Sequence, residues 1–144
     1  KLARDPMLRA FAEHHLATEQ KHLGLIASWL PPAQFSRLLP LWRLAGFLTG
    51  ALPSLFGPKA VYATIEAVET FVNQHYEDQI CALASQPDLN DLCQTLLDCQ
   101  ADEVAHRDEA AAARGPTRPN IVLRAWCAML GVGSSAAVSL IRHA

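Results

Sequence analysis

The chain has 144 residues, of which 51% are hydrophobic and 18% are charged, and its formal net charge at pH 7 is −2. This length suits one domain with a single core, and the charge balance, without a dense Lys/Arg block, excludes the electrostatic footprint of a nucleic-acid-binding protein. The four cysteines form no CxxC pair, which indicates reduced thiols rather than a secreted disulfide framework. We therefore expect residues 1–144 to form one intracellular-type domain.

The first expected helix covers residues 6–29. Asp5 followed by a proline is typical of a helix start, and Pro31 ends the helical spacing of apolar and histidine residues. In its second half Glu19 and His22 are three residues apart, which places a carboxylate and an imidazole on one face. This Glu-x-x-His unit is the element from which helical bundles build carboxylate-bridged di-iron sites.

The most apolar segment covers residues 35–57 and reads FSRLLPLWRLAGFLTGALPSLFG. Arg37 and Arg43 are its only charges, and prolines and glycines interrupt it. It is interpreted either as a helical hairpin packed on the bundle or as an element that lies on or dips into a membrane surface, or lines a channel for a hydrophobic ligand. No uninterrupted apolar run in the chain reaches the ~18 residues that span a bilayer.

A further helix is expected over residues 59–84, with a polar stripe on one face. Spacings of three, four and seven bring Tyr62, Glu66, Glu69, Asn73 and Tyr76 together. Apolar neighbours crowd these carboxylates, which suggests that Glu69 points inward, whereas Glu66 is either its neighbour or a surface residue.

The helix after this one is expected to begin with Asp88 as N-cap and to continue to about Arg114. On it Glu103 and His106 form a second Glu-x-x-His unit, which continues an apolar stripe. A buried carboxylate and imidazole without partners are costly, and a metal ion is the simplest compensation for both. A last apolar helix with small residues is expected over residues 121–141, as packing or membrane-facing surface. Without any strand pattern, the predicted fold class is all-α.

The inward-facing ligand types thus come from three helices, and they are Glu19, His22, Glu69, Glu103 and His106. Carboxylates with one imidazole per metal suit Fe(II) or Mn(II), whereas zinc would more often recruit thiols. A complete bundle site of this type takes a lone glutamate from each of two helices and Glu-x-x-His from each of the other two. This chain supplies one lone glutamate.

Four segments, EQKHL, LLPLWRLAGFLTGALPSLFGPKA, AVETFVNQHYEDQI and DEVAHRD, stand in an order and at a spacing that resemble the Coq7 family, the demethoxyubiquinone hydroxylases of ubiquinone biosynthesis. The resemblance covers nearly the whole chain. Its most specific parts are the LPLW-to-GxK stretch and the pattern of Glu69, His75, Tyr76 and Gln79, which generic ferritin-like proteins do not share.

The resemblance implies a ferritin-like bundle with two irons that activates O2 to hydroxylate the ring of a demethoxyubiquinone. Glu19 and Glu103 would bridge the irons, His22 would bind one of them, and the remaining ligands, His106 and Glu69, would bind the other. The helical position of His75, six residues after Glu69, favours hydrogen bonding near the site over direct ligation, with Tyr76 beside it.

The resemblance also implies partners and a location. The broken apolar segment would dock on a membrane and admit the hydrophobic quinone, at the cytoplasmic face of the bacterial inner membrane or the matrix side of the mitochondrial one. A lipid-binding or ubiquinone-biosynthesis partner protein and a homo-oligomer are further expectations. No GxGxxG motif is present, so electrons would come from NADH directly, from the quinone or from a partner.

One departure from the family pattern concerns a glutamate in a His-Ala-Gly-Glu stretch on a helix that would precede Lys1. Glu13 is a poor geometric substitute, so the iron at His22 would lack its terminal carboxylate. We expect the chain to be N-terminally incomplete; the alternative is a degenerate member with an incomplete site. Two alternatives stay open: a ferritin-like iron or peroxide-handling protein without hydroxylase activity, and a non-catalytic helical protein that binds a membrane surface.

The remaining ionisable residues are expected outside the site. His14, His15 and His143 are interpreted as surface or interface residues. Solvated helix faces are expected for the other acidic residues of these helices, namely Glu13, Glu77, Asp78, Asp102 and Glu109.

Overall fold

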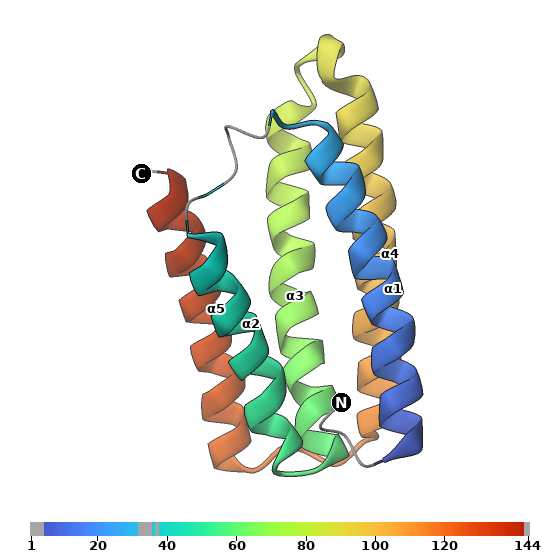
Figure 1. Cartoon of the computed structure of the whole chain (residues 1–144), viewed down its shortest axis with the longest axis vertical. Coiled ribbons are helices and arrows are strands. Elements are labelled where there is room, and N and C mark those ends of the chain that lie inside the picture. The colour runs from blue at the N-terminus through green and yellow to red at the C-terminus, as the bar shows by residue number, and fades with distance from the viewer. Residues whose placement is uncertain (1–4, 32–35, 37, 143–144) are drawn as a thin grey trace.

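The computed structural model describes residues 5–31, 36 and 38–142, and within these ranges it contains helices and no strand (Figure 1). The predicted all-α fold class is confirmed. The helices are α1 (Pro6–Ser28), α2 (Leu39–Ser54), α3 (Pro58–Leu83), α4 (Asn90–Arg114) and α5 (Ile121–Arg142), with a short 3-10 turn (Pro87–Leu89) before α4. The four cysteines are free, as expected.

The helix ends follow from local chemistry. At the start of α1, Oδ1 of Asp5 accepts hydrogen bonds from the backbone N–H groups of Met7 and Leu8, at 2.8 and 3.0 Å. Gly57, before α3, and Gly115, after α4, have φ angles of 92° and 77°, which favour glycine. Gly57 and Gly115 therefore mark the start of α3 and the end of α4.

Two predicted boundaries are wrong. The N-cap of α4 is Leu89 rather than Asp88, because Pro87 begins a separate 3-10 turn that includes Asp88. The apolar segment forms one helix, α2, instead of a hairpin. Pro40 lies in the first turn, where its missing N–H has no partner within the helix, and Pro53 lies inside the last turn, where it removes one backbone hydrogen bond without ending the helix before Ser54. Phe35 and Arg37 lie outside the described residues.

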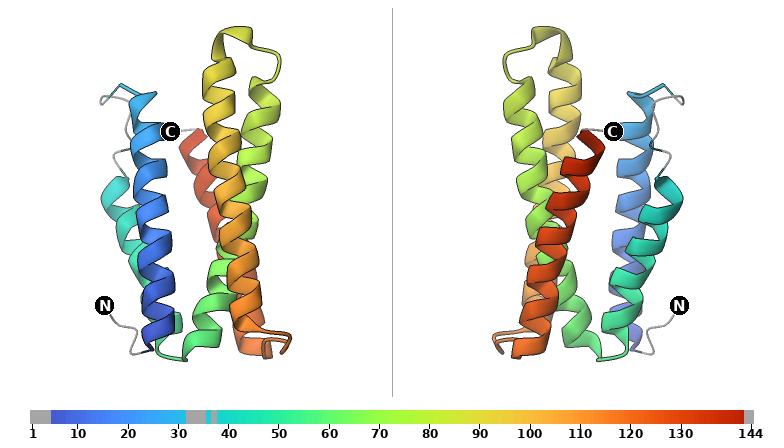
Figure 2. Two further views of the ribbon diagram at one scale, coloured as in Figure 1. Left: turned by 90° about the vertical axis from the view of Figure 1, so that its right-hand side faces the viewer. Right: turned by 90° about the vertical axis from the view of Figure 1, so that its left-hand side faces the viewer.

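α3 is the central helix of the bundle. It packs against α4, α5 and α2, and α1 packs against α4. Figure 1 shows α2 and α5 on the left of the molecule and α1 and α4 on the right, and the two views of Figure 2 look at the molecule from these two sides. Buried polar side chains gather between α1 and α4, and they are His15, His22, Glu103 and His106. The polar interior therefore lies on the side away from α2 and α5.

The outer faces of α2 and α5 are apolar. Leu41 and Phe47 on α2 have exposed fractions of 53% and 62%. Among the described residues α5 is the one helix long and apolar enough to cross a membrane, by length and composition alone, over Ile121–Leu140. The sequence showed no uninterrupted run of that length because Arg124 divides it.

Candidate metal centre

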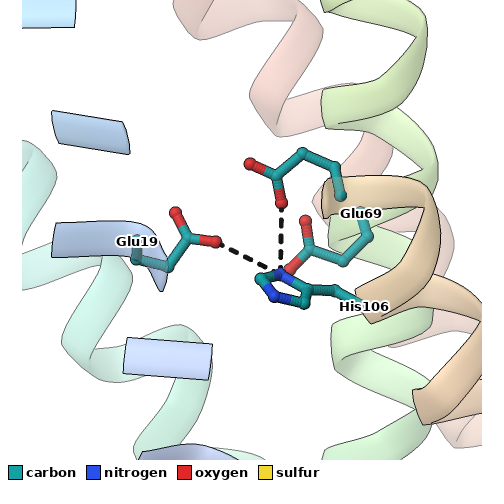
Figure 3. Close-up of side chains that lie close together, drawn as sticks. Glu19, Glu69 and His106 are labelled. Atoms are coloured by element: carbon teal, nitrogen blue, oxygen red, sulfur yellow. Dashed lines mark ion pairs between the residues drawn. The ribbon is translucent and has the colours of Figure 1, made fainter. Parts of the chain in front are cut away.

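Three helices bring four ligand-type side chains to one point. Glu19 comes from α1, Glu69 from α3, and Glu103 and His106 from α4, and one ligand atom from each lies within 4.8 Å of all the others. Figure 3 shows Glu19, Glu69 and His106 converging from their separate helices. We call these four residues the carboxylate cluster. They are four of the five ligands that the sequence singled out.

Two atoms of the carboxylate cluster are buried without a hydrogen-bond partner. They are Oε2 of Glu103 and Nδ1 of His106, whose side chains are 3% and 4% exposed. Nδ1 of His106 lies 3.5 Å from Oε2 of Glu103 and 3.5 Å from Oε1 of Glu19. A buried unsatisfied polar group costs about 1–3 kcal/mol. A cation among these atoms would satisfy all of them, so the residues fit a bound metal.

The electrostatics of the carboxylate cluster favour neutral side chains when no cation is present. Burial raises the pKa of both Glu69 and Glu103, and the neighbouring charge of Glu19 raises them further. Burial also lowers the pKa of His106 to about 4. His106 is therefore neutral at pH 7, which is the form that ligates metals. A divalent cation would reverse the penalty on the carboxylates.

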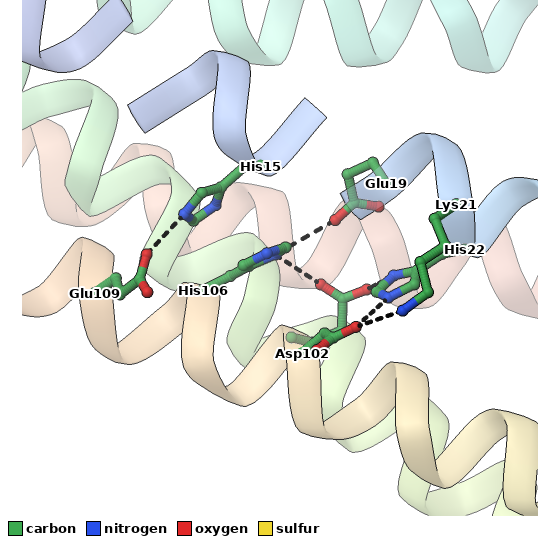
Figure 4. Close-up of polar contacts among 8 residues, drawn as sticks. His15, Glu19, Lys21, His22, Asp102, His106 and Glu109 are labelled. Atoms are coloured by element: carbon green, nitrogen blue, oxygen red, sulfur yellow. Dashed lines mark hydrogen bonds and ion pairs between the residues drawn. The ribbon is translucent and has the colours of Figure 1, made fainter. Parts of the chain in front are cut away.

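His22 lies beside the carboxylate cluster and contacts it through Glu103. Its buried ring has Nδ1 3.1 Å from Oε1 of Glu103 and Nε2 3.0 Å from Oδ2 of Asp102 (Figure 4). Glu103 therefore stands between two imidazoles, with Oε1 toward Nδ1 of His22 and Oε2 toward Nδ1 of His106. This arrangement allows one carboxylate to bridge two ligand sets.

Asp102 is a residue of the site that the sequence analysis placed on a solvated face. The hydrogen bond from His22 holds the pKa of Asp102 below its ordinary value, so Asp102 is ionised and Nε2–H of His22 is the donor. Nδ1 is then the nitrogen that faces Glu103. A carboxylate that fixes the tautomer of a histidine is a usual companion of metal ligands. Its position next to Glu103 was the available signal.

The expectation that His15 is a surface residue is wrong. His15 is 8% exposed, its ring stacks on that of His106 at a centroid distance of 3.9 Å, and its Nε2 lies 3.1 Å from Oε2 of Glu109. Residues 15, 19 and 22 share a helical face, so the spacing held this information. His14 is exposed, as predicted, and His143 lies outside the described residues.

His75 and Tyr76 differ in their relation to the cluster. His75 accepts a hydrogen bond from Nε2–H of Gln79 at 2.9 Å and stacks on Phe71, one turn away on α3. Tyr76 bonds to the thiol of Cys99, and burial together with nearby negative charge raises the pKa of its hydroxyl. Tyr76 is thus electrostatically coupled to the carboxylates.

The sequence left two alternatives for Glu66, a neighbour of Glu69 or a surface residue, and its contacts in the structure place it outside the carboxylate cluster. Its carboxylate binds Arg114, with Nε 2.7 Å from Oε2 and Nη2 3.3 Å from Oε1. This ion pair joins α3 to the last turn of α4. Glu66 is therefore a structural residue away from the carboxylate cluster.

An apolar cleft leads to the carboxylate cluster from the side of α2. It has a volume of about 580 Å³ and is lined by α1, α2 and α3, with Leu8, Phe47 and Val68 among its walls. Glu69 is the single carboxylate in its lining. The cleft therefore gives an apolar route to Glu69, which belongs both to the cleft lining and to the carboxylate cluster.

Comparison with known proteins assigns these features to a family. Residues 1–141 match the family described as ubiquinone biosynthesis protein COQ7. The chain belongs to the COQ7 family. The resemblance drawn from the sequence is confirmed, and the match covers the helices that carry the cluster.

Relatives in this COQ7 family are named hydroxylases. A 3-demethoxyubiquinol 3-hydroxylase of Rhodospirillum rubrum is 36% identical over 97 residues, which cover 66% of this chain and 45% of the relative. The mitochondrial 5-demethoxyubiquinone hydroxylase of Saccharomyces cerevisiae is 34% identical over 88 residues, 52% of this chain and 38% of the relative.

A third relative, of Dictyostelium discoideum, carries a cofactor in its name. This mitochondrial NADPH-dependent 3-demethoxyubiquinone 3-hydroxylase is 31% identical over 102 residues, 70% of this chain and 46% of the relative. The chain thus spans less than half the length of these relatives. No solved structure matches the chain.

Proposed function

We propose that this COQ7-family protein hydroxylates the ring of a demethoxyubiquinone with O2, at an iron centre held by the carboxylate cluster. The observation that carries the proposal is the pair of buried, unpartnered atoms, Oε2 of Glu103 and Nδ1 of His106, among further carboxylates. A protein retains such a costly arrangement for a function, and bound metal is the function that relieves it.

In this proposal Glu69 and His106 would hold one iron, His22 would hold a second, and Glu19 and Glu103 would be shared between them. The bound irons would supply the redox chemistry that activates O2. A carboxylate-rich set with one imidazole per metal is typical of Fe(II) or Mn(II), whereas structural zinc sites more often recruit thiolates. The position of Glu103, between Nδ1 of His22 and Nδ1 of His106, supports its bridging role.

The other residues of the chain hold these ligands in place. Asp102 accepts from Nε2–H of His22 and so fixes the orientation of its ring, with Nδ1 toward Glu103. His15 stacks on His106 and limits rotation of that ring. Burial of Glu103 and His106 excludes water from the centre of the site. The chain thus contributes ligand geometry and a dry interior.

The apolar cleft supports a hydrophobic ring substrate over a small polar one. Its walls are almost entirely apolar, and it ends at Glu69. This feature favours the hydroxylase over the alternative of a ferritin-like iron or peroxide-handling protein, because neither iron storage nor peroxide removal needs an apolar approach. The electrons are proposed to come from a reduced nicotinamide nucleotide, as the name of the Dictyostelium relative states for that protein.

The experiment for this function is anaerobic loading of the protein with Fe(II), followed by addition of O2, a reductant and a short-tailed demethoxyubiquinone. Iron content and the hydroxylated quinone are measured together. Two irons per chain and a hydroxylated product are expected. Iron binding without product would favour the ferritin-like alternative, and failure to bind iron would contradict the proposed centre.

The proposed location is the surface of an inner membrane, at the cytoplasmic or matrix face, with α2 and α5 toward the lipid. The exposed apolar side chains Leu41 and Phe47 support it. Replacing both with lysine, Leu41→Lys with Phe47→Lys, is expected to weaken binding to lipid vesicles. The matched control is Met7→Lys with Leu23→Lys, at residues that are 80% and 66% exposed on α1. Equal loss in both double variants would contradict docking through α2.

A further inference from the structure

A second cavity lies where the end of α2 meets the starts of α3 and α5. Its volume is about 660 Å³, and it shares no lining residue with the cleft at Glu69. Its walls are mostly apolar, with Leu52 and Phe56 from α2 and Leu123 and Trp126 from α5. Its size falls within the roughly 300–1,000 Å³ of small-molecule sites. No residue of the carboxylate cluster lines it.

The charges of this second cavity are all positive. Lys59, Arg114 and Arg118 line it, and its lining contains no carboxylate, although the whole chain has a net charge of −2. Arg114 is neutralised by Glu66, at 2.7 Å. Among the described residues Lys59 and Arg118 form no ion pair, and both are exposed at the cavity. Two cations are therefore available to a ligand.

The surrounding backbone adds to this positive character. Lys59 lies in the first turn of α3, and the cavity also meets the start of α5, where Oδ1 of Asn120 accepts from the N–H of Leu123 at 2.9 Å. Helix N-termini carry a partial positive charge. The ligand that complements this cavity is an amphiphile with an apolar body and an anionic group.

We propose that the second cavity binds one anionic phospholipid, with its phosphate at Lys59 and Arg118 and the start of its acyl chains along Leu52, Phe56 and Leu123. The inference rests on the proposed membrane-surface location, because α2 and α5 form one side of the molecule (Figure 1) and the cavity lies where their ends meet.

The test uses soluble lipids, so that it does not depend on docking to a bilayer. Monomeric dihexanoyl phosphatidylglycerol and dihexanoyl phosphatidylcholine are titrated into the iron-loaded protein and followed by calorimetry and by tryptophan fluorescence, to which Trp126 in the cavity lining contributes. We expect saturable binding of one phosphatidylglycerol, about 30-fold tighter than phosphatidylcholine, since each of the two basic residues near an anionic lipid contributes about 1 kcal/mol.

The cation pair is tested by the double variant Lys59→Gln with Arg118→Gln, which should remove the preference for phosphatidylglycerol. The control, Arg9→Gln with Arg107→Gln, makes the same change in net charge at residues outside the lining and should keep the preference. Equal binding of the two lipids, or equal loss in both double variants, overturns the proposal. Free glycerol phosphate that binds as tightly as the lipid overturns the lipid as the ligand.

The result is separable from the proposed hydroxylase function. A protein that binds two irons and hydroxylates the quinone, yet shows no saturable phosphatidylglycerol binding, retains the proposed function and loses this site. Saturable binding by a protein without iron or activity supports this site and contradicts the function.

Discussion

The two Glu-x-x-His histidines have different surroundings. Nδ1 of His106 has no hydrogen-bond partner and faces Glu19 and Glu103 at 3.5 Å. Both ring nitrogens of His22, in contrast, lie within 3.1 Å of a carboxylate oxygen, one from Glu103 and one from Asp102. From the sequence the His22 side is the one short of a terminal carboxylate, whereas in the structure the His106 side is the one with an unpartnered ring nitrogen.

This difference indicates an order of metal binding. A metal at His106 replaces only the two 3.5 Å contacts of Nδ1 with Glu19 and Glu103, neither of which is a hydrogen bond, so little has to be broken before it binds. A metal at His22 must first displace the contact with Glu103, which costs part of the binding free energy. We therefore expect the His106 side to fill first and the His22 side to fill second, with Glu103 common to both.

The largest expected effect comes from Glu103→Ala, because this carboxylate serves both histidines. Iron binding and quinone hydroxylation should be lost by more than the ~10–100-fold that follows from changing an outer partner of a metal ligand. Helix content by circular dichroism should stay nearly unchanged. Asp108→Asn, on an exposed face of α4, is the control and should retain activity. Retained hydroxylation in Glu103→Ala would refute the bridging role.

The order in which the two sides bind Fe(II) is tested by His106→Gln and His22→Gln. His106→Gln should abolish the tighter of the two Fe(II)-binding steps, whereas His22→Gln should keep that step and lose the weaker one. Anaerobic titration calorimetry distinguishes the two steps. Loss of the tight step in His22→Gln alone would reverse the assignment of the two sides.

Asp102→Asn tests the His22 side without removing a proposed ligand. The neutral amide accepts a weaker hydrogen bond from Nε2–H of His22, and the weaker iron step should lose about 10–100-fold in affinity. The tight step should be unchanged, and Asp102→Glu should restore part of the loss. A uniform loss of both steps would indicate a general loss of structure.

The pH dependence of the metal-free protein reports on the His106 side. Glu69 and Glu103 have pKa values raised above 4.5, so the folded state holds more protons than the unfolded state once the pH passes that value. Stability of the metal-free protein should therefore fall by about 1–2 kcal/mol from about pH 6.5 to about pH 8.

Iron loading should reverse this trend, because metal binding requires deprotonated carboxylates and becomes stronger as the pH rises. Thermal unfolding of the metal-free and loaded forms at both pH values measures the difference. A metal-free unfolding temperature that rises over this range would contradict the burial of the two carboxyl groups.

The smallest effect is expected from His15→Leu, which removes the ring stacked on His106. Stacked ring pairs contribute about 0.5–1.5 kcal/mol, so the tight iron step should weaken by about 3- to 10-fold. His14→Leu, at the adjacent exposed position, is the matched control and should leave both steps unchanged. Equal effects of the two substitutions would contradict a role of His15 in supporting His106.

The sequence predicted much of this arrangement and missed specific parts of it. Helical spacing placed Glu19, Glu69 and Glu103 on inward faces because each is three or four residues from other inward positions. The same spacing cannot give depth, so His15 and Asp102 were assigned to solvent. Their contacts come from residues 80 or more positions away, which no local pattern contains.

The apolar helix α2 shows a second limit of local patterns. Its prolines and glycines favoured a broken segment, such as a hairpin, but it forms one helix in which Pro40 lies in the tolerant first turn and Pro53 in the last turn, one residue before the helix ends. The positions of helix breakers relative to the helix ends decide their effect. The sequence alone does not state these ends.

The location of the iron centre is measured by anomalous diffraction at the iron edge, from crystals of the protein grown anaerobically with limiting Fe(II). We expect a first peak among the ligand atoms of Glu19, Glu69, Glu103 and His106, and a second peak beside His22 when Fe(II) is in excess. A first peak at His22, or no iron within the carboxylate cluster, would contradict this expectation.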